Sequence, residues 1–314
     1  MDEQKKRNNL IDIVRLLCAV LVVAIHTSPF NSLENTALVD VFVKLNRTAV
    51  PMFLLIAGAF FWEKVKQSGI TYAKKYFVRI ATMYVFWSVL YAACTYPVYY
   101  EFPSLLSLIK VFACQLLYYG TFDHLWYFVC VIYCVILSIM LLHYIKAEYI
   151  LKFAFPFFFA TYILLFFAFG QHLSVQAKRI LYNMPFFFLG TMAPEKTDKN
   201  RVTAIMAVSF VLLLLEWHFY EIAYYPFLLY VFLLYLFKYL SINEKLGQHM
   251  NSVGHYAQIT SSIMYTSQFL IILPLGKIIS FDRGNLIFII TVAVELLLGW
   301  LLSRCKLRML RYII

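Results

Sequence analysis

Long runs of apolar residues, separated by short polar segments, follow one another along the whole chain. The runs are about 17–22 residues long, the length an α-helix needs to cross roughly 30 Å of hydrocarbon. They do not alternate apolar and polar residues, as the strands of a membrane β-barrel do. The pattern predicts an all-α polytopic membrane helical bundle of about ten transmembrane helices. The expected spans are 9–28, 47–63, 80–97, 125–143, 150–169, 180–193, 202–219, 222–240, 257–279 and 285–303.

The composition supports a membrane protein. Of the 314 residues, 63% are hydrophobic and only 14% are charged, and the mean hydropathy is +0.76. A soluble globular protein with this much apolar surface would precipitate. The net charge of +11 does not indicate nucleic acid, because short cytoplasmic loops of membrane proteins collect Lys and Arg. We therefore expect membrane lipid, and no nucleic acid, as a partner.

The distribution of Lys and Arg predicts the orientation of the helices. Placing both termini in the cytoplasm puts most of the 27 basic residues on the cytoplasmic side, provided that 104–119 (SLLSLIKVFACQLLYY) does not cross. If this segment crossed, the basic residues would be almost evenly divided. We therefore interpret 104–119 as an interfacial or re-entrant segment on the outer side. The expected organisation is one integral membrane domain over 1–314, in a bacterial-type plasma membrane.

The sequence offers no grouping of residues typical of a metal or redox site. The six cysteines include no Cys-x-x-Cys pair and mostly lie inside apolar runs, so we expect buried thiols that form neither disulfides nor metal sites. No glycine-rich phosphate loop or nucleophile elbow is present. The first apolar run lacks a cleavage site and is expected to stay as a signal-anchor helix.

The first predicted helix, RNNLIDIVRLLCAVLVVAIHTSPF (7–30), carries Asp12, Arg15 and His26. Ionisable side chains at bilayer depth are costly and often mark a site. Asp12 and Arg15 are three residues apart and can pair, whereas Arg15 and His26 lie on one face about 16 Å apart along the axis. Two interpretations stay open: charges that snorkel to the interfaces, or a polar stripe facing the bundle interior.

A series of segments resembles the acyltransferase-3 family of integral membrane acyltransferases. Arg7, Asp12 and Arg15 followed by His26 are similar to its first-helix signature. Further similar segments follow in order along the chain: Arg47-Thr-Ala-Val-Pro51-Met-Phe53 with Ala57-Gly58, Lys74-Lys75 with Arg79, His124-Leu125-Trp126-Tyr127, Phe187-Phe188-Leu189-Gly190, and Ser262-Ile-Met-Tyr265.

Two positions depart from the pattern of that family. Gln268 stands where members commonly have a His after the Tyr, and Ala57 replaces a small polar residue. A second, softer resemblance is to the membrane half of vancomycin-resistance serine racemases, through VVAIHTSPF and the stretch Glu216-Trp-His-Phe-Tyr-Glu221.

The resemblance implies transfer of an acetyl or similar group from cytoplasmic acetyl-CoA, the acyl-donor co-substrate, to a hydroxyl of an extracytoplasmic or lipid-linked cell-envelope glycan. His26 is the expected general base, because neutral imidazole accepts protons at physiological pH. Arg47 is expected to stabilise an oxyanion or to hold an acidic acceptor, and the alternative is that it anchors the helix at the interface. Glu216, Glu221 or Asp123 would orient His26, and spacing does not decide between them.

Cations near the cytoplasm are expected to bind the phosphates of the donor. The candidates are Arg15, held by Asp12, together with Lys75 and Arg79, although cytoplasmic loops are basic for topological reasons as well. On the outer side, Asp123, His124 and Trp126 are candidates for binding the acceptor. The alternative for this group is an aromatic belt at the membrane interface.

A different class of function also fits about ten helices with embedded charges: a transporter or flippase of a small polar solute, such as serine, or of a lipid-linked glycan. Such a protein would favour inverted repeats and helices broken at mid-membrane, and neither is evident. The acceptor, the length of the acyl group and the oligomeric state stay open. Glu295, in the middle of the last span, has no identifiable partner in the sequence.

Overall fold

The computed structural model describes residues 8–30, 37–99, 104–170, 172–193, 197–219, 227–279 and 283–305. All regular elements in these ranges are helices, which confirms the all-α prediction. Seven helical stretches of the described chain are long and apolar enough to cross a membrane. They are Asn9–Thr27, Val39–Pro97, Asp123–Tyr144, Ala147–Phe169, Lys199–Trp217, Glu244–Ile278 and Gly284–Arg304; Leu105–Tyr119 and Phe227–Ile242 are shorter apolar helices.

The chain divides into two compact units. Unit 1 consists of Met1–Phe53 and Lys196–Leu307, and unit 2 of Leu54–Glu195 and Arg308–Ile314. The long helix α3 (Ala49–Tyr99) begins in unit 1 and continues through unit 2.

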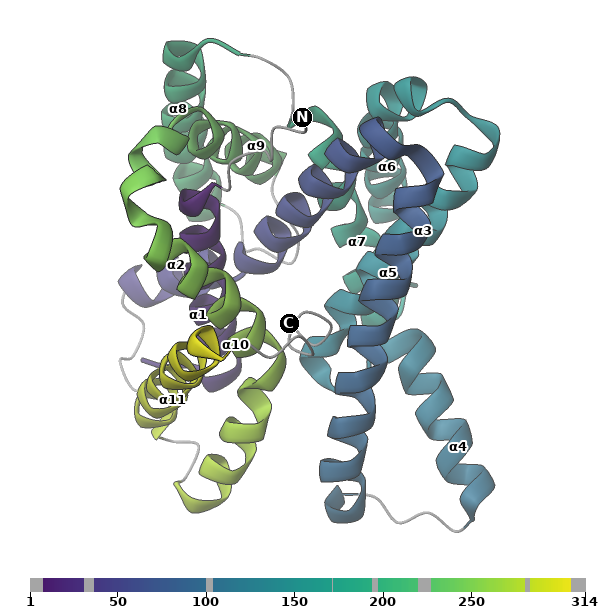
Figure 1. Ribbon diagram of the computed structural model, residues 1–314, viewed down its shortest axis with the longest axis vertical. Helices are drawn as coiled ribbons and strands as arrows, with labels where there is room; N and C mark the ends of the chain where they lie inside the picture. Colours follow the sequence, from purple (N-terminus) through teal and green to yellow (C-terminus); the bar gives the residue numbers. More distant parts are fainter. Residues whose placement is uncertain are drawn as a thin grey trace. The chain divides into compact units, whose positions relative to one another are not determined.

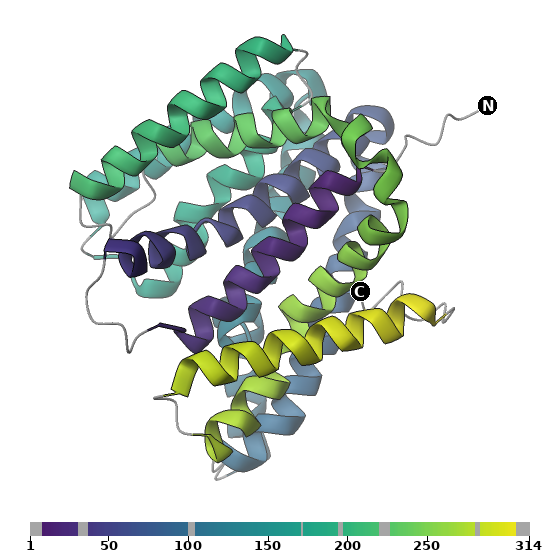
Figure 2. The same ribbon diagram turned by 90° about the vertical axis from the view of Figure 1, so that its left-hand side faces the viewer.

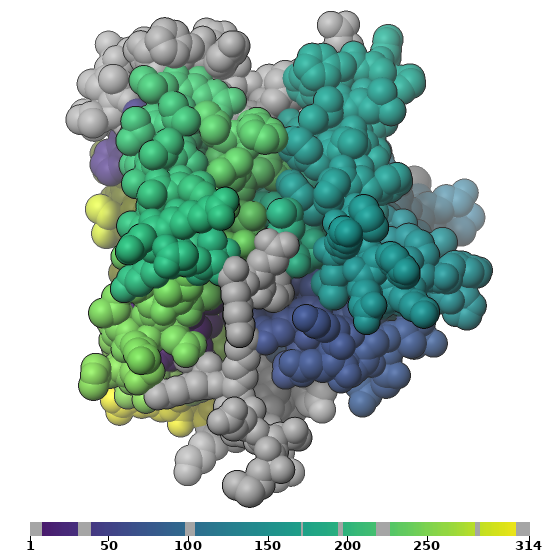
Figure 3. Space-filling model, turned by 90° about the horizontal axis from the view of Figure 1, so that it is seen from above, coloured from purple at the N-terminus to yellow at the C-terminus, as the bar shows by residue number. Residues whose placement is uncertain are grey.

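Unit 1 is organised around one central helix, α10 (Asn251–Ile278). Helix α1 (Asn9–Thr27) packs along it, and α11 (Gly284–Arg304) packs on it as well (Figures 1 and 2). Helices α8 (Lys199–Phe219) and α9 (Phe227–Ile242) pack on each other, and the short α2 (Ala37–Asn46) contacts α1. Several apolar side chains of α8 are exposed, as expected of a helix with one face toward lipid (Figure 3): Val208, Phe210, Val211, Leu212 and Leu215.

Unit 2 contains the rest of α3, then α4 (Leu105–Cys114), α5 (Trp126–Tyr144), α6 (Ala147–Phe169) and α7 (Val175–Leu189). Helix α7 packs on both α5 and α6. Short 3₁₀ helices precede α5 at Asp123–Leu125 and follow α7 at Gly190–Met192.

Helix α3 corrects one expectation. The expected spans 47–63 and 80–97 leave the segment 64–79 as a connection, but it is helical apart from a break at Gly69. Gly69 has φ 57° and ψ −145°, a conformation that glycine adopts without a Cβ penalty. The surrounding residues are mostly good helix formers such as Lys, Glu, Gln and Ala, so the helix resumes directly after the break.

The segment 104–119 is helical. It forms α4 and then a π-helix, Gln115–Tyr119, which ends before Gly120. Tyr84 donates a hydrogen bond to the carbonyl oxygen of Leu116 at 2.7 Å, and Tyr133 donates to that of Leu117. The π-helix thus presents carbonyl groups to tyrosines of two neighbouring helices. Its interfacial or re-entrant placement stays a prediction.

Two helical segments lie where the sequence indicated connections. Helix α2 follows the first span, and the stretch 241–255, between the expected spans 222–240 and 257–279, contains a 3₁₀ helix at Glu244–Met250 and the start of α10. Both are too short or too polar to give a spanning signal, so hydropathy alone treated them as loops.

In unit 2, α3 and the end of α7 cross with their backbones in contact. A Cβ placed on Gly58 would lie 1.9 Å from the carbonyl oxygen of Phe187, and one on Gly190 would lie 2.3 Å from the backbone nitrogen of Ala59. Small residues permit such close crossings in membrane helices. Two of the segments that carry the family resemblance therefore pack on each other.

Candidate functional site

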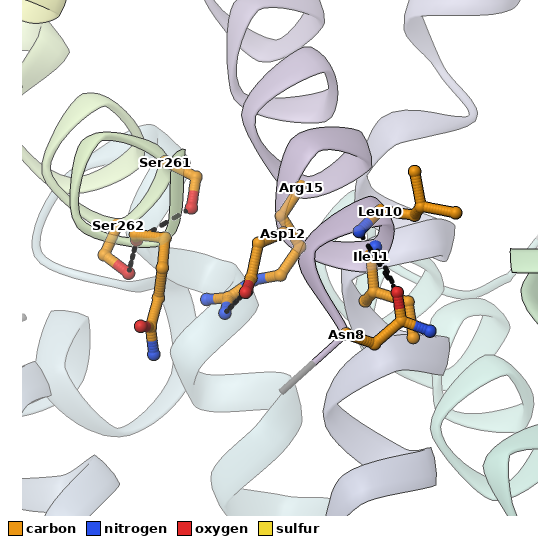
Figure 4. A network of polar contacts seen from close by, with 8 residues as sticks. Asn8, Leu10, Ile11, Asp12, Arg15, Ser261 and Ser262 are labelled. Atoms are coloured by element: carbon orange, nitrogen blue, oxygen red, sulfur yellow. Dashed lines mark hydrogen bonds and ion pairs between the residues drawn. The ribbon is translucent and has the colours of Figure 1, made fainter. Parts of the chain in front are cut away.

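Helix α1 is held in place at its N-terminal end. Asn8 caps its first turn by accepting hydrogen bonds from the backbone of Leu10 and Ile11 (Figure 4). The amide of buried Asn9 donates to the carbonyl oxygen of Gly247 at 2.7 Å and to Asn251 at 2.8 Å. These bonds attach the start of α1 to the segment that leads into α10. They therefore fix the position of the next turn of α1, which carries Asp12, along α10.

Asp12 and Arg15 form the ion pair that their spacing predicts. Asp12 Oδ1 lies 3.6 Å from Arg15 Nη1, and the side chains are 9% and 24% exposed. Figure 4 shows the pair on the side of α1 that faces Ser261 and Ser262 of α10. The predicted pairing is confirmed, and its role in donor binding stays a prediction.

His26 lies in the last turn of α1 and is half-buried. Its ring meets the ring of Phe269 edge-on, with centroids 4.7 Å apart. Phe269 is seven residues, or about two helical turns, beyond Ser262 on α10. Both ends of the polar stripe on α1 therefore lie against the same neighbouring helix within unit 1.

Helix α2 connects the end of α1 with the end of α8. Phe30, just after α1, packs edge-on against Phe42 of α2 at 5.4 Å. Lys44 of α2 donates to Asp40 at 2.6 Å and to the carbonyl oxygen of Trp217 in α8 at 2.5 Å. This end of unit 1 therefore contains the exit of α1, the whole of α2 and the last turn of α8.

Two further predicted residues belong to unit 1. Arg47 lies in the turn between α2 and α3 and is exposed, and Glu216 is half-buried next to Trp217 near the end of α8. Through α2, the structure brings the helix ends that carry His26, Arg47 and Glu216 to one end of the unit. Glu221, the other acidic candidate of this stretch, lies outside the described residues.

The remaining predicted residues belong to unit 2. Lys75 and Arg79 are exposed on α3, after the break at Gly69. Asp123 forms an ion pair with Arg179 of α7 at 2.6 Å, so a cation other than an imidazole holds this carboxylate.

His124 and Trp126 lie at the start of α5. The His124 side chain is only 1% exposed, and its ring packs edge-on against Tyr91 at 5.1 Å and Phe122 at 5.9 Å. Trp126, the first residue of α5, is half-buried. Within unit 2, His124 is thus part of the packed aromatic interior, while Asp123 beside it remains partly exposed.

The sequence did not indicate the partner of Glu295. This residue of α11 is fully buried, and its Oε1 lies 2.7 Å from the hydroxyl of Ser267 in α10. Ser267 and Glu295 lie on two successive spans, and a single sequence carries no signal of which faces of two adjacent spans meet. Within the described ranges, no three or more His, Cys, Asp or Glu side chains are grouped to hold a metal ion.

Comparison with known proteins assigns the chain to a family. Residues 8–304 match the family model of acyltransferase family 3, described as an acyltransferase domain. A stretch of 140 residues is 33% identical to a protein of Enterococcus faecalis named amino-acid racemase. That match covers 40% of this chain and 18% of the relative, so the chain spans less than a fifth of that relative's length. No solved structure matches. Together with its long apolar helices, the match over residues 8–304 identifies the chain as a multi-pass membrane protein that belongs to the acyltransferase-3 family.

Proposed function

We propose that this membrane acyltransferase moves an acetyl or similar acyl group from cytoplasmic acyl-CoA to a hydroxyl of an extracytoplasmic or lipid-linked cell-envelope glycan. The observation that carries the proposal is the stripe on α1. An Asp12–Arg15 pair near one end of the helix and His26 at the other both lie against α10. A cation suits the phosphates of a donor, and an imidazole suits a hydroxyl acceptor.

The reaction needs one proton to move from the acceptor to the leaving group. His26 takes the proton of the acceptor hydroxyl, whose oxygen attacks the thioester carbonyl. The tetrahedral oxyanion is stabilised by Arg47, and the carbon–sulfur bond then breaks. The thiolate of CoA leaves and receives the proton from His26, so that the products are an ester and free CoA. Glu216, at the same end of unit 1, orients the imidazole in its productive tautomer.

Donor binding uses the basic residues nearer the cytoplasm. Arg15, held in place by Asp12, contacts a phosphate of the donor, and the exposed Lys75 and Arg79 of α3 attract the remaining negative charge. On the acceptor side, Asp123 and Trp126 are partly exposed and supply a polar and an aromatic contact to the glycan, with His124 supporting them from the packed interior.

The test is acyl transfer by the purified full-length protein in liposomes, measured as free CoA released and as labelled acetyl groups gained by an envelope glycan extract. We expect His26→Ala to lower transfer about 10²–10⁴-fold, the usual contribution of a general base. The matched control is His143→Ala. His143 is an exposed histidine in the last turn of α5, and its removal should leave transfer unchanged. Equal rates for His26→Ala and the wild type would overturn the proposal.

A second function is favoured by one observation, the match to a protein named amino-acid racemase. A membrane region associated with that chemistry would suit uptake of a small polar solute such as serine. The discriminating experiment measures serine flux into liposomes beside CoA release from acetyl-CoA. Flux without CoA release supports transport, and CoA release without flux supports acyl transfer.

A further inference from the structure

Glu295 is the most unusual acidic residue of unit 1. It lies in the middle of α11, in a helix that is long and apolar enough to cross the membrane, and its side chain is fully buried. Its Oε1 contacts the hydroxyl of Ser267, and Oε2 has no hydrogen-bond partner among the described residues. No described Lys, Arg or His side chain forms an ion pair with it.

An ionised carboxylate at this position would be strongly destabilising. Removing a carboxylate from water without a counter-ion costs several kcal/mol or more even after the protein relaxes, and one hydroxyl hydrogen bond to a charged group returns only about 1.5–3 kcal/mol. The balance favours the neutral acid. Protonation of the carboxyl removes the charge and keeps the contact with Ser267.

The hydrogen bonds of Ser267 lead independently to the same conclusion. Its Oγ lies 2.8 Å from the carbonyl oxygen of Ile263 and 2.7 Å from Glu295 Oε1. A hydroxyl has one hydrogen to donate. If Glu295 is ionised, its Oε1 and the carbonyl oxygen of Ile263 can both accept a hydrogen bond but neither can donate one. One of the two contacts would then lack a hydrogen. If Glu295 carries a proton, it donates to Ser267, and Ser267 donates to Ile263.

The titratable and charged groups on the helices packed against α11 supply no alternative counter-ion. They are His255, Tyr256, Tyr265 and Lys277 on α10 and Asp12, Arg15, Cys18 and His26 on α1. Of these, Tyr256 contacts α11 directly, but its hydroxyl donates to the carbonyl oxygen of Leu296 at 2.8 Å. Thr291, one turn before Glu295 on α11, is buried, and its hydroxyl has no partner in the described chain. It is a neutral hydrogen-bond donor suited to Oε2.

We propose that Glu295 is a buried proton-binding site between α10 and α11, in which a protonated carboxyl donates to Ser267 and Ser267 donates to the carbonyl oxygen of Ile263. The ligand is a proton taken from solvent. The site does not depend on acyl transfer. Ser267 and Phe269 are two residues apart on α10, so they point to opposite sides of this helix, and Phe269 contacts His26. Protonation of Glu295 therefore also stabilises the helix against which the candidate base packs.

The experiment is infrared spectroscopy of the full-length protein in lipid at neutral pH. A protonated carboxyl gives a carbonyl-stretch band apart from the amide bands, and the band shifts in heavy water. We expect Glu295→Gln to remove this band, because glutamine keeps the shape and a donor but carries no acid. Ser267→Ala should keep the band and shift it, since the acid stays buried but loses its acceptor. The matched control is Glu148→Gln, which removes an exposed carboxylate of α6 and should leave the band unchanged.

Three results would overturn the proposal. The first is a wild-type protein without any protonated-carboxyl band, which decides the matter even if the variants fail to fold. The second is a Glu295→Gln variant that folds and retains the whole band. The third is loss of the band when sodium or potassium chloride is added, because the site would then bind a metal cation in place of a proton. Since none of these readouts measures acyl transfer, their failure is separate from a failure of the proposed function.

Discussion

Two helix contacts, one in each unit, show different uses of a membrane helix pair. In unit 2, α3 and α7 cross backbone to backbone at Gly58 and Gly190, and large aromatic side chains surround the crossing. In unit 1, the Asp12–Arg15 pair of α1 lies on the side that faces Ser261 and Ser262 of α10, and His26 of α1 packs on Phe269 of α10. The first contact gains dispersion energy from close packing, whereas the second retains polar groups that close packing would exclude.

We therefore expect the unit 2 crossing to contribute to stability and the proposed site of unit 1 to contribute to chemistry. Phe61 of α3 and Phe187 of α7, with ring centroids 5.3 Å apart, illustrate the apolar packing of the first. Arg15 and His26 are both only half-buried, which leaves them accessible to a ligand. The following variants test this division, from the largest expected effect to the smallest.

Gly58→Leu should have the largest effect. A side chain at this position would overlap the backbone of Phe187, which cannot move without separating α3 from α7, and the cost should be at least about 3 kcal/mol. The measurement is the yield of folded protein and its melting temperature in detergent. Gly69→Ala is the control: nothing lies within 4 Å of its Cβ position, so only the unfavourable backbone conformation costs energy, about 1–3 kcal/mol. Equal loss in both variants would show that the close crossing is unimportant.

Arg15→Gln should raise the KM for the acyl-CoA donor about tenfold or more, because a charge-assisted hydrogen bond to phosphate contributes about 1.5–3 kcal/mol. It should also destabilise the protein, since the buried Asp12 loses its ion pair with Arg15. The double variant Asp12→Asn with Arg15→Gln is the control. It should recover stability while donor binding stays weak. Recovery of both would mean that Arg15 serves only the ion pair.

Asn9→Asp should lower the melting temperature, with a loss of about 1–3 kcal/mol in the free energy of unfolding. The substitution keeps the shape but removes the amide that donates to Gly247 and Asn251, which tie α1 to the segment before α10. Hydrogen exchange of the first turns of α1 measures the loosening. The comparison is Asn46→Asp, because Asn46 is also a buried asparagine of unit 1 but lies on α2. Unchanged exchange in α1 would argue against Asn9 as an anchor of the α1–α10 contact.

Asp123→Asn should have the smallest effect on stability, about 0.2–1 kcal/mol, because the ion pair with Arg179 is partly exposed to solvent. The kinetics of this variant test whether unit 2 contacts substrate or has only a structural role. An unchanged melting temperature with a raised KM for the acceptor would mean that this unit also contacts substrate. Unchanged kinetics would confine the chemistry to unit 1. Glu148→Gln, an exposed carboxylate of the same unit, should alter neither quantity.

Much of the fold follows from local properties of the chain. Apolar runs of spanning length predicted every long helix, because the backbone must satisfy its own hydrogen bonds in hydrocarbon. The same reasoning misassigned 64–79, where hydropathy falls but helix propensity does not, and it treated α2 as a connection. For the site, the i, i+3 spacing of Asp12 and Arg15 predicted their ion pair, since the geometry of one helix determines which side chains meet.

The sequence by itself determined the fold class, the membrane character and the position of three ionisable groups on one face of α1. Only the tertiary structure decided which helix that face meets, that Asp123 pairs with Arg179 and that Glu295 contacts Ser267. The physical reason is the range of the interactions. Hydropathy and helical spacing act within one segment, whereas the rotation of each helix about its axis is set by packing and hydrogen bonds to residues far away in the chain.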